Sequence, residues 1–162
     1  MEGKIIITSD STCDLSPALL EENHISLARL SVILGDTTYR DGEGIEPQTI
    51  FDFVEKTGDL PKTAAPSLED YLHFFRSFTD KGNTVIHFNI SSKASGSHGF
   101  AVAAQKEIGE DKVYVVDSYA LSTGQGLLVM KACDLVKEGK SAKEIYDAVM
   151  SLRDKVNTSF IP

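Results

Sequence analysis

The sequence predicts an α/β fold, built as a three-layer, mostly parallel sheet with helices on both faces. Short runs rich in Ile and Val alternate with segments whose apolar residues recur at helical spacing. Proline, serine and glycine stand where these helices are expected to begin and end. Strands separated by helices pair in parallel, because right-handed crossovers place the helices on the sheet faces. The length of 162 residues suits one domain, so we expect residues 1–162 to fold as a single α/β domain.

The first half of the chain is expected to begin with a buried strand and to continue with a helix, a hairpin and two further helices. Ser16 and Pro17 are typical of a helix start, and Gly58 is typical of a helix end. The expected elements are a strand over 4–8, a helix over 17–23, a hairpin of 25–34 and 37–39, a helix over 47–57, a loop over 62–67 and a helix from 68 to Gly82.

The second half continues the alternation and ends in two helices. Residues 84–90 and 112–117 are β-rich runs, and the segment between them has the apolar spacing of a helix. Gly139 ends the first of the last two helices. Ser141 and Glu144 form a capping box that begins the second.

Composition argues against several classes of protein. The formal net charge is -8 and the 16 Lys and Arg residues are scattered, so no basic surface for nucleic acid is expected. No apolar run approaches the roughly 18 residues that a bilayer span needs. Cys13 and Cys133 fit neither a disulfide framework nor a zinc site, so both are expected as buried free thiols. We expect a cytoplasmic protein without a transmembrane segment or a nucleic-acid partner.

The sequence also lacks the common metal and cofactor motifs. No His, Cys or carboxylate residues occur at a metal-ligand spacing, and no GxxxxGK[ST] or GxSxG motif occurs. Gly124-Gln125-Gly126 resembles the start of a dinucleotide-binding GxGxxG motif, but Val129 stands where the last glycine is needed. We therefore expect no metal and no cofactor.

Polar residues gather where the predicted strands end. Ligands of parallel α/β sheets bind outside the carboxyl ends of the strands, so residues after different strands are expected to share one edge. Thr63, in the loop over 62–67, is expected to reach the same edge. The helices that follow offer free backbone N–H groups, which suit a carboxylate or a phosphate. The other residues of this edge are Asp10 and Ser11 after the first strand, Ser92, Ser95, Gly96 and Ser97 after 84–90, and Ser118 after 112–117.

The same hydroxyls have a simpler explanation, because Ser and Thr are the common caps of helix starts. Only their convergence at one edge favours a ligand site. The histidines are expected in ordinary places: His24 and His73 at the surface, His87 as a satisfied core residue and His98 facing solvent or capping a loop.

Five motifs resemble those of the DegV family of bacterial fatty-acid-binding proteins. They occur in the family's order and spacing along nearly the whole chain. The motifs are Ser9-Asp10-Ser11-Thr12-Cys13-Asp14-Leu15 (SDSxxDL), Tyr39-Arg40-Asp41-Gly42, Lys62-Thr63-Ala64-Ala65-Pro66-Ser67 (KTSxPS), Ser91-Ser92-Lys93-Ala94-Ser95-Gly96-Ser97 (SSxLSGT), and Val115-Val116-Asp117-Ser118 with Ser122, Gly124 and Gly126 (VxDSxxxSxGxG).

The resemblance implies a binding protein rather than an enzyme. Family members hold one long-chain fatty acid between two α/β domains and present it to a kinase partner that forms the acyl phosphate. Carried over to this chain, Thr63 and Ser95 contact the fatty-acid carboxylate. The supporting rim is formed by Asp10, Ser11, Ser92, Gly96, Ser97 and Ser118.

This chain departs from the family pattern in three loop residues and in length. Ala64 replaces a usual Ser, Ala94 a usual Leu, and Ser97 a usual Thr. Family chains continue into a second, carboxy-terminal domain that covers the lipid, and we expect that residues 1–162 lack this domain. We therefore expect weaker binding of the acid and an exposed apolar surface that is available for self-association.

Two other functions remain open from the residues. Related sheets in dihydroxyacetone kinases and sugar phosphotransferase subunits bind small substrates at the same edge, with a histidine in the covalent role. In that phosphotransfer enzyme, His98 would be the candidate. The other alternative is a non-catalytic interaction or regulatory domain, in which the serines only cap helices.

Overall fold

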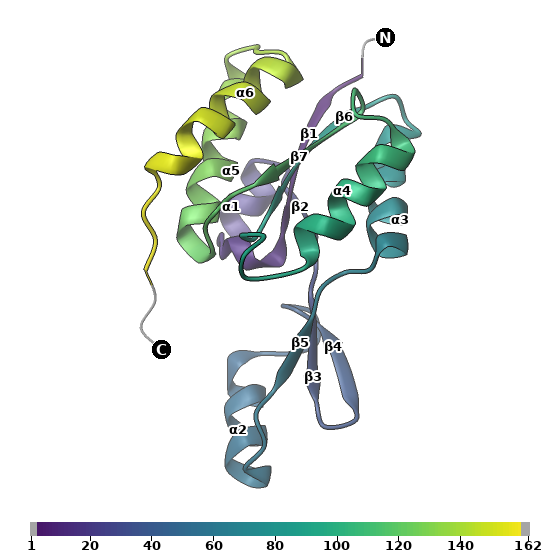
Figure 1. Ribbon diagram of the computed structural model, residues 1–162. Helices are drawn as coiled ribbons and strands as arrows, with labels where there is room; N and C mark the ends of the chain where they lie inside the picture. The colour runs from purple at the N-terminus through teal and green to yellow at the C-terminus, as the bar shows by residue number, and fades with distance from the viewer. Residues whose placement is uncertain (1–2, 160–162) are drawn as a thin grey trace.

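The structure, a computed structural model, describes residues 3–159 and consists of a main body and a small lobe (Figure 1). The main body contains β1 (Ile5–Asp10), the 3-10 turn η1 (Ser11–Cys13), α1 (Pro17–Glu22), β2 (Ser26–Ala28), α3 (Leu68–Thr79), β6 (Thr84–Asn89), α4 (Ser97–Ile108), β7 (Val113–Asp117), α5 (Ser122–Lys137), α6 (Ala142–Leu152) and η2 (Arg153–Lys155). The small lobe contains β3 (Ser31–Leu34), β4 (Thr37–Arg40), α2 (Pro47–Thr57) and β5 (Lys62–Ala64).

A parallel sheet forms the middle layer of the main body. Its four strands lie in the order β2-β1-β6-β7, and every neighbouring pair is parallel. Helices α3 and α4 pack on one face, while α1, α5 and α6 pack on the other (Figure 1). The predicted three-layer α/β fold is therefore confirmed.

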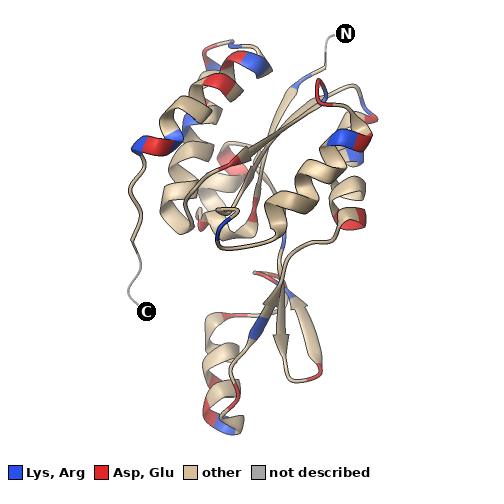
Figure 2. Cartoon of the chain, viewed as in Figure 1, with Lys and Arg blue, Asp and Glu red and all other residues tan. Residues whose placement is uncertain are grey.

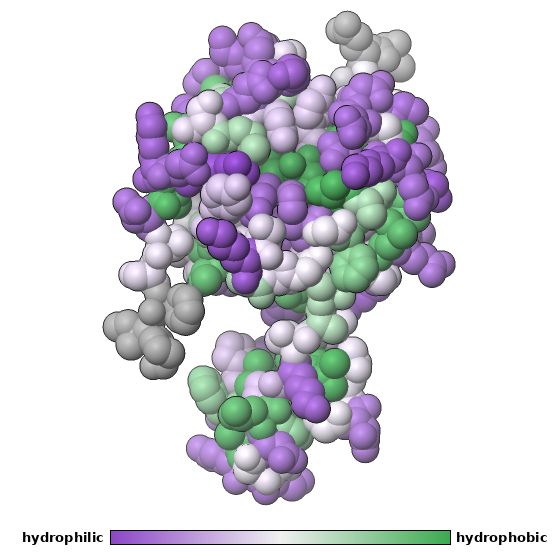
Figure 3. All heavy atoms as spheres, in the orientation of Figure 1, coloured by the Kyte–Doolittle hydropathy of each residue, from purple (hydrophilic) through white to green (hydrophobic). Residues whose placement is uncertain are grey.

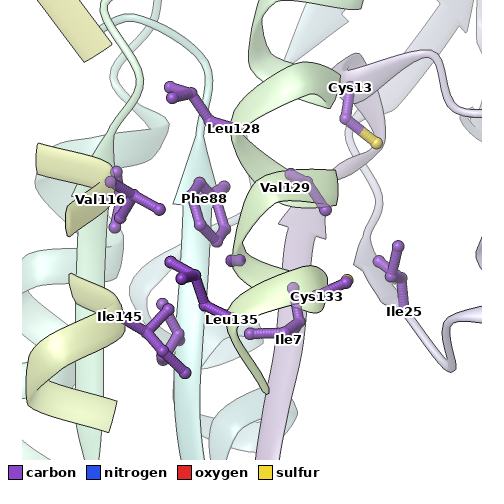
Figure 4. Packing of buried hydrophobic residues seen from close by; sticks show 13 residues of the cluster. Ile7, Cys13, Ile25, Phe88, Val116, Leu128, Val129, Cys133, Leu135 and Ile145 are labelled. Atoms are coloured by element: carbon purple, nitrogen blue, oxygen red, sulfur yellow. The ribbon is translucent and has the colours of Figure 1, made fainter. Parts of the chain in front are cut away.

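Two apolar cores hold the three layers together, because side chains of each strand alternate between the faces. On the α5 side, Phe88 and Val116 of the sheet pack with Leu128, Val129 and Ile145 (Figure 4). Each large apolar side chain buried in this way stabilises the fold by about 1.5 to 3 kcal/mol. The core on the opposite face includes Tyr71, Phe75, Val85, Ala101 and Val113.

The predicted helix boundaries rest on caps that the structure confirms. The Ser141 side chain accepts the Glu144 N–H, and the Glu144 carboxylate accepts the Ser141 N–H at 2.8 Å. Ser67 and Asp70 form a second capping box at the start of α3. Gly58 ends α2 at a φ of 75°, a conformation that glycine adopts without strain.

The small lobe differs from the prediction in two segments. Residues 25–34 were expected as one strand, but β2 joins the parallel sheet and β3 joins a separate sheet of order β4-β3-β5. The expected strand is interrupted at Arg29 and Leu30, because the chain passes from the parallel sheet to the sheet of the small lobe at these residues. Residues 62–64 were expected in a loop, and instead form β5, an edge strand that pairs antiparallel with β3. The predicted hairpin is confirmed as β3 and β4.

Charged residues lie mostly on the outer helices and loops, and the strands carry few of them (Figure 2). Cys13 and Cys133 are buried free thiols, as predicted, and burial raises the pKa of Cys133 to about 11. Within residues 3–159, no helix has both the length and the apolar composition needed to cross a membrane.

Candidate functional site

The carboxyl edge of the parallel sheet contains a buried carboxylate, Asp10, at the end of β1. Its side chain is completely shielded from solvent. Asp10 Oδ1 accepts the Tyr71 hydroxyl at 2.6 Å, and Oδ2 accepts the Ile90 backbone N–H at 3.1 Å. Burial, followed by the charge of Asp10 and its hydrogen bond, raises the pKa of Tyr71 far above the usual range. Tyr71 therefore remains a neutral phenol that donates to Asp10.

His87 and Asn89, on β6, complete the surroundings of Asp10. Asn89 Nδ2 lies 3.2 Å from Oδ1 and 3.1 Å from Oδ2 of Asp10, and His87 Nε2 lies 3.3 Å from Oδ1. The other ring nitrogen of His87 lies 2.9 Å from the Thr8 hydroxyl. His87 is thus a satisfied core histidine, as predicted. Asp10 was expected on the rim, but the structure places it in the interior, where it anchors a polar network beneath the rim.

Ser95 and Ser97 come together in the loop between β6 and α4. Ser95 Oγ accepts the Ser97 backbone N–H at 3.2 Å and lies 2.9 Å from Ser97 Oγ. Ser97 is fully buried, whereas Ser95 is half-buried. A Cβ added at Gly99, in the first turn of α4, would meet no atom within 4 Å, so there is open space beside the helix start. Ser95 therefore holds a fixed hydroxyl at the start of α4, where Gly96 and Gly99 are exposed.

The loop after β7 is tied to the Ser95 loop through Asp117. Its Oδ1 accepts the backbone N–H groups of Ser92, at 3.1 Å, and Tyr119, at 3.2 Å. Ser118 is buried, and its hydroxyl donates to the Ala120 carbonyl oxygen at 3.1 Å. Ser118 thus shapes its own turn. Two of the loops predicted to converge at this edge are directly hydrogen-bonded to each other.

Ser11 and Gly96 have structural roles in the backbone of this edge. The Ser11 hydroxyl accepts the Leu30 N–H at 3.2 Å, which holds the crossing from β2 to β3 against the end of β1. Gly96 is the N-cap of α4 and provides no side-chain cap. A Cβ added there would lie 3.8 Å from the Phe100 ring, so Gly96 lies beside an exposed aromatic side chain.

Thr63 lies on β5 of the small lobe and is exposed. It pairs with Val32 of β3, and β3 continues from the carboxyl end of β2 through Arg29 and Leu30. The small lobe therefore extends from the carboxyl edge of the parallel sheet, the side on which the Ser95 loop lies (Figure 1). A direct meeting of the Thr63 and Ser95 hydroxyls around a ligand stays a prediction.

His98, which was expected to face solvent or cap a loop, is half-buried. Its Nδ1 lies 3.4 Å from Asn89 Oδ1, and burial lowers its pKa below the ordinary histidine value. His98 is the second residue of α4 and follows Ser95 by three residues in the chain. It connects the exposed rim to the buried Asp10 network through Asn89.

Several polar residues of this edge were missed by sequence reasoning. Asn89, Tyr71, Gln125 and Arg153 are neither simple caps nor family motif residues. Gln125 is buried and donates to Ser9 Oγ at 2.9 Å, while Arg153 stacks on the Tyr119 ring at 3.9 Å. Only Asn89 had a signal in the sequence, the period-two polarity inside an apolar strand, because Tyr71, Gln125 and Arg153 lie on helical segments. Thr8 with Asp10, and His87 with Asn89, lie at positions whose side chains share one face of the sheet.

A separate hollow of about 520 Å³ lies between the small lobe and α3. Arg29, Arg40, Asp70 and His73 line it, and Thr63 and Ser95 do not. This lining is too charged for an acyl chain. Among residues 3–159, no cluster of three or more His, Cys, Asp or Glu side chains is arranged to hold a metal ion.

Comparison with known proteins agrees with the motifs. The model of a family described as uncharacterised DegV proteins matches residues 4–162. A fatty-acid-binding DegV family protein from Thermus thermophilus is 34% identical with a TM-score of 0.86, covering 93% of this chain and 54% of that chain. A stearic-acid-binding protein from Eubacterium ventriosum is also 34% identical, with a TM-score of 0.79 and coverages of 92% and 52%.

A third solved structure is the Streptococcus pneumoniae fatty acid kinase (Fak) B3 protein loaded with linoleic acid. It is 26% identical, with a TM-score of 0.78, and the match covers 93% of this chain and 54% of that chain. The present chain spans about half the length of the curated relatives that it matches. The match of the family model over nearly the whole chain leads to one conclusion: this chain belongs to the DegV family.

Proposed function

We propose that this chain binds the carboxylate of a long-chain fatty acid at the carboxyl edge of its parallel sheet and presents it to a fatty-acid kinase. The hydroxyls of Ser95 and Thr63 donate hydrogen bonds to the carboxylate. The observation that carries the proposal is the geometry of Ser95. The Ser97 backbone N–H fixes the Ser95 oxygen, and when Ser97 Oγ donates within the serine pair, the Ser95 proton is free to point to a ligand.

The surroundings of Ser95 suit an anion with an apolar tail. The start of α4 adds free N–H groups and a partial positive charge without adding a charged side chain. Phe100, one turn further along α4, is 45% exposed and lies beside Gly96, so an acyl chain leaving the carboxylate would meet an apolar surface. Relatives with 34% identity are described as fatty-acid-binding or stearic-acid-binding proteins, which supports the ligand class.

The tail and the head contribute differently to binding. Burial of an acyl chain contributes about 0.8 kcal/mol per methylene, whereas each hydrogen bond to a charged group contributes roughly 1.5 to 3 kcal/mol. The hydroxyls therefore orient the acid, and the tail provides most of the affinity. A fatty-acid kinase needs this orientation, because the carboxylate oxygen must be presented to the phosphoryl donor. The similarity to the fatty acid kinase B3 protein supports this partner class.

Substitution of the two hydroxyls tests the proposal. Calorimetric titration with sodium decanoate, kept below its micelle concentration, should give about tenfold weaker binding for Ser95→Ala and for Thr63→Val. Native mass spectrometry of the protein expressed in bacteria should also find less co-purified fatty acid. Thr37→Val, an exposed threonine on β4, and Ser151→Ala, an exposed serine on α6, are matched controls. Unchanged affinity in both hydroxyl variants would contradict the assigned site.

The kinase role needs a second measurement. Chain loaded with oleate, mixed with ATP and a bacterial fatty-acid kinase, should yield acyl phosphate that hydroxylamine traps. Kinase with ATP and free oleate should yield much less. Equal yields with and without the chain would remove presentation from the proposed function, while leaving fatty-acid binding to be judged by the calorimetry.

A further inference from the structure

The protonation of His98 is set by a chain of hydrogen bonds that begins at Asp10. A carboxylate accepts hydrogen bonds and cannot donate them. Asp10 is surrounded by donors, since the Tyr71 hydroxyl, the Ile90 N–H and the Asn89 side chain all point to it. Each group that contacts Asp10 must therefore face it with a hydrogen-bond donor.

Asn89 has only one orientation that suits Asp10. Its amide nitrogen lies within 3.2 Å of both Asp10 oxygens, and also 3.1 Å from the Tyr71 oxygen. Turning the amide over would place its oxygen against the carboxylate, acceptor facing acceptor. The amide oxygen, Oδ1, is thus directed to the other side, where it lies 3.4 Å from Nδ1 of His98.

This orientation decides which nitrogen of His98 carries the proton. An amide oxygen has no proton to give, so the ring nitrogen that faces it must be Nδ1–H. Burial lowers the pKa of His98, so the free protein holds the ring in its neutral form near pH 7. In the neutral Nδ1–H form, Nε2 carries a lone pair and no proton. His98 therefore has a vacant proton position at Nε2, three residues after Ser95 in the chain.

The charges around His98 come from four elements of the main body. Asp117 at the end of β7 and Asp10 on β1 raise its pKa, while His87 on β6 and Arg153 after α6 lower it. Burial outweighs all of these. Arg153 is held in place, because it stacks on Tyr119 and donates from Nη1 to the Asp117 carbonyl oxygen at 3.2 Å. A new anion near His98 is the change that would favour its charged form.

We propose that His98 takes up one proton at Nε2 when an acyl carboxylate binds beside Ser95, and that the resulting imidazolium pairs with the carboxylate. This inference rests on the proposed fatty-acid function. The proton comes from solvent, or from the acid itself when it arrives as the neutral form, and no covalent bond is made or broken other than N–H. The Nδ1–H group of His98 remains hydrogen-bonded to Asn89 Oδ1 before and after binding, so the ring does not need to rotate. The site thus gains a positive charge only when it is occupied.

The sign of the pH dependence follows from linkage. The pKa of His98 lies below 6.5 in the free protein and is higher in the complex. Between these two values binding takes up a proton, so affinity falls as pH rises through the pKa of the complex. Each unit by which binding raises the pKa corresponds to about tenfold tighter binding at low pH than at high pH.

Titration calorimetry with sodium decanoate tests proton uptake directly. The wild-type chain is titrated at one pH near 7 in phosphate and in Tris, which differ widely in ionisation enthalpy. The apparent binding enthalpy should differ between the buffers. Divided by the difference in their ionisation enthalpies, this difference should approach one proton taken up per decanoate bound. His98→Asn keeps an N–H that can donate to Asn89 but cannot titrate, so it should bind about tenfold more weakly with no buffer dependence. His24→Asn, at an exposed histidine whose φ of 53° suits asparagine, is the matched control and should behave as wild type.

Each result of this titration has one meaning. Decanoate binding with equal enthalpies in both buffers would overturn the role of His98 and leave the fatty-acid function intact. Buffer dependence that persists in His98→Asn would also overturn it, because the proton would then enter elsewhere. No binding of decanoate or longer acids to wild type would remove the proposed function, and this inference with it.

Nitrogen NMR of the imidazole rings provides a second readout that needs no ligand. His98 in the free protein should show a protonated Nδ1 and a bare Nε2 at pH 7, and saturating decanoate should protonate Nε2. Asn89→Leu removes the acceptor of Nδ1–H and should release this tautomer preference, with the fold checked by circular dichroism. A free protein in which Nε2 carries the proton would overturn the inference, since no proton position would be vacant there.

Discussion

The main body and the small lobe bury their residues to different degrees. In the main body, Tyr71, Phe75 and Phe88 are completely buried. In the small lobe, no residue of α2 is buried, and its core rests on Val32, Leu34 and Ile45. Phe51 and Leu60 of the lobe are 62% and 77% exposed, and hydrophobic atoms are visible on its surface (Figure 3). The lobe therefore has fewer buried contacts to resist local opening.

Because of this difference, one part of the candidate site lies in the well-packed main body and the other part lies in the less buried small lobe. Ser95, Asn89 and His98 belong to the main body, where side chains and backbone fix one another. Thr63 lies on β5, a three-residue edge strand with no buried residue. We expect ligand binding to reposition Thr63 more than Ser95.

A contact at the crossing limits how far the lobe can move. Arg29 donates from Nη1 to the Asp41 carbonyl oxygen at 2.6 Å, and its Nε lies 2.8 Å from the Glu43 carboxylate. Both partners lie in the turn after β4, so Arg29 ties the chain leaving the main body to the lobe. The charge pair is partly exposed, and such pairs contribute at most about 1 kcal/mol. The contact positions the lobe without adding much stability.

The largest expected effect comes from matched truncations in the two cores. Phe75→Ala in the main body should lower the free energy of unfolding by about 3 to 5 kcal/mol, because it leaves a cavity among fully buried side chains. Phe53→Ala in the lobe should cost only about 1 to 2 kcal/mol, since Phe53 is half-buried. Urea unfolding followed by circular dichroism measures both.

Hydrogen exchange locates the damage. Phe53→Ala should raise exchange in β3 and β5 more than in β6, whereas Phe75→Ala should raise exchange in both parts to a similar extent. An equal rise of exchange in β3, β5 and β6 for the Phe53→Ala variant would mean that lobe and body unfold as one unit. In that case Thr63 and Ser95 are held equally firmly.

The fold was largely predictable because its signals are local. Apolar runs, the capping box of Ser141 and Glu144, and Gly58 each act within one turn of the chain. The strand break at Arg29 and Leu30 was not predictable, because it depends on which sheet each half joins. Local propensity is the same for both halves, and only tertiary packing separates them.

The candidate site was predictable in position but not in chemistry. The carboxyl edge and the pair of Ser95 and Ser97 follow from topology and from motif spacing. The role of Asp10 as a buried acceptor depends on Tyr71 and Asn89, which reach it from 61 and 79 residues away in the sequence. The motif that contains Asp10 does not include these partners, so the sequence predicts Asp10 only as a rim residue. The contact of His98 was not predictable for the same reason, since His98 lies on α4 and its partner Asn89 lies on β6.

A smaller effect tests how tightly the main body is packed at the start of α5. Gly126→Ala would place a Cβ 2.7 Å from the Cys13 carbonyl oxygen and 3.0 Å from a Leu15 methyl group. Backbone must shift to make room, so we expect a loss of about 1 to 3 kcal/mol despite the higher helix propensity of alanine. Gly124→Ala should cost less, because its nearest neighbour is the side-chain end of exposed Thr158, which can rotate away. Thermal unfolding compares the two variants, and a larger loss for Gly124→Ala would show that the segment after α6 is the firmer contact.

The smallest expected effect separates the two capping boxes. Ser67 begins α3, directly after the chain leaves the lobe, and Ser141 begins α6 within the body. Replacing either by Ala removes a cap and should lower stability by about 1 kcal/mol at pH 7. Hydrogen bonds from Ser67 lower the pKa of Asp70, and those from Ser141 lower the pKa of Glu144, below the ordinary values of 3.8 and 4.5. Each contribution is therefore present above these values and is lost as pH falls through the lowered pKa of the folded state.

Hydrogen exchange at pH 7 then connects this prediction to the lobe. Ser67→Ala should raise exchange in β5 and β3, because fraying of α3 loosens the point from which the lobe extends. Ser141→Ala should leave those amides unchanged while lowering stability by a similar amount. If both variants raise exchange in the lobe equally, opening of the lobe depends on the stability of the whole protein and not on the connection of the lobe to α3. A response confined to Ser67→Ala would instead show that the start of α3 controls how readily the lobe that carries Thr63 opens.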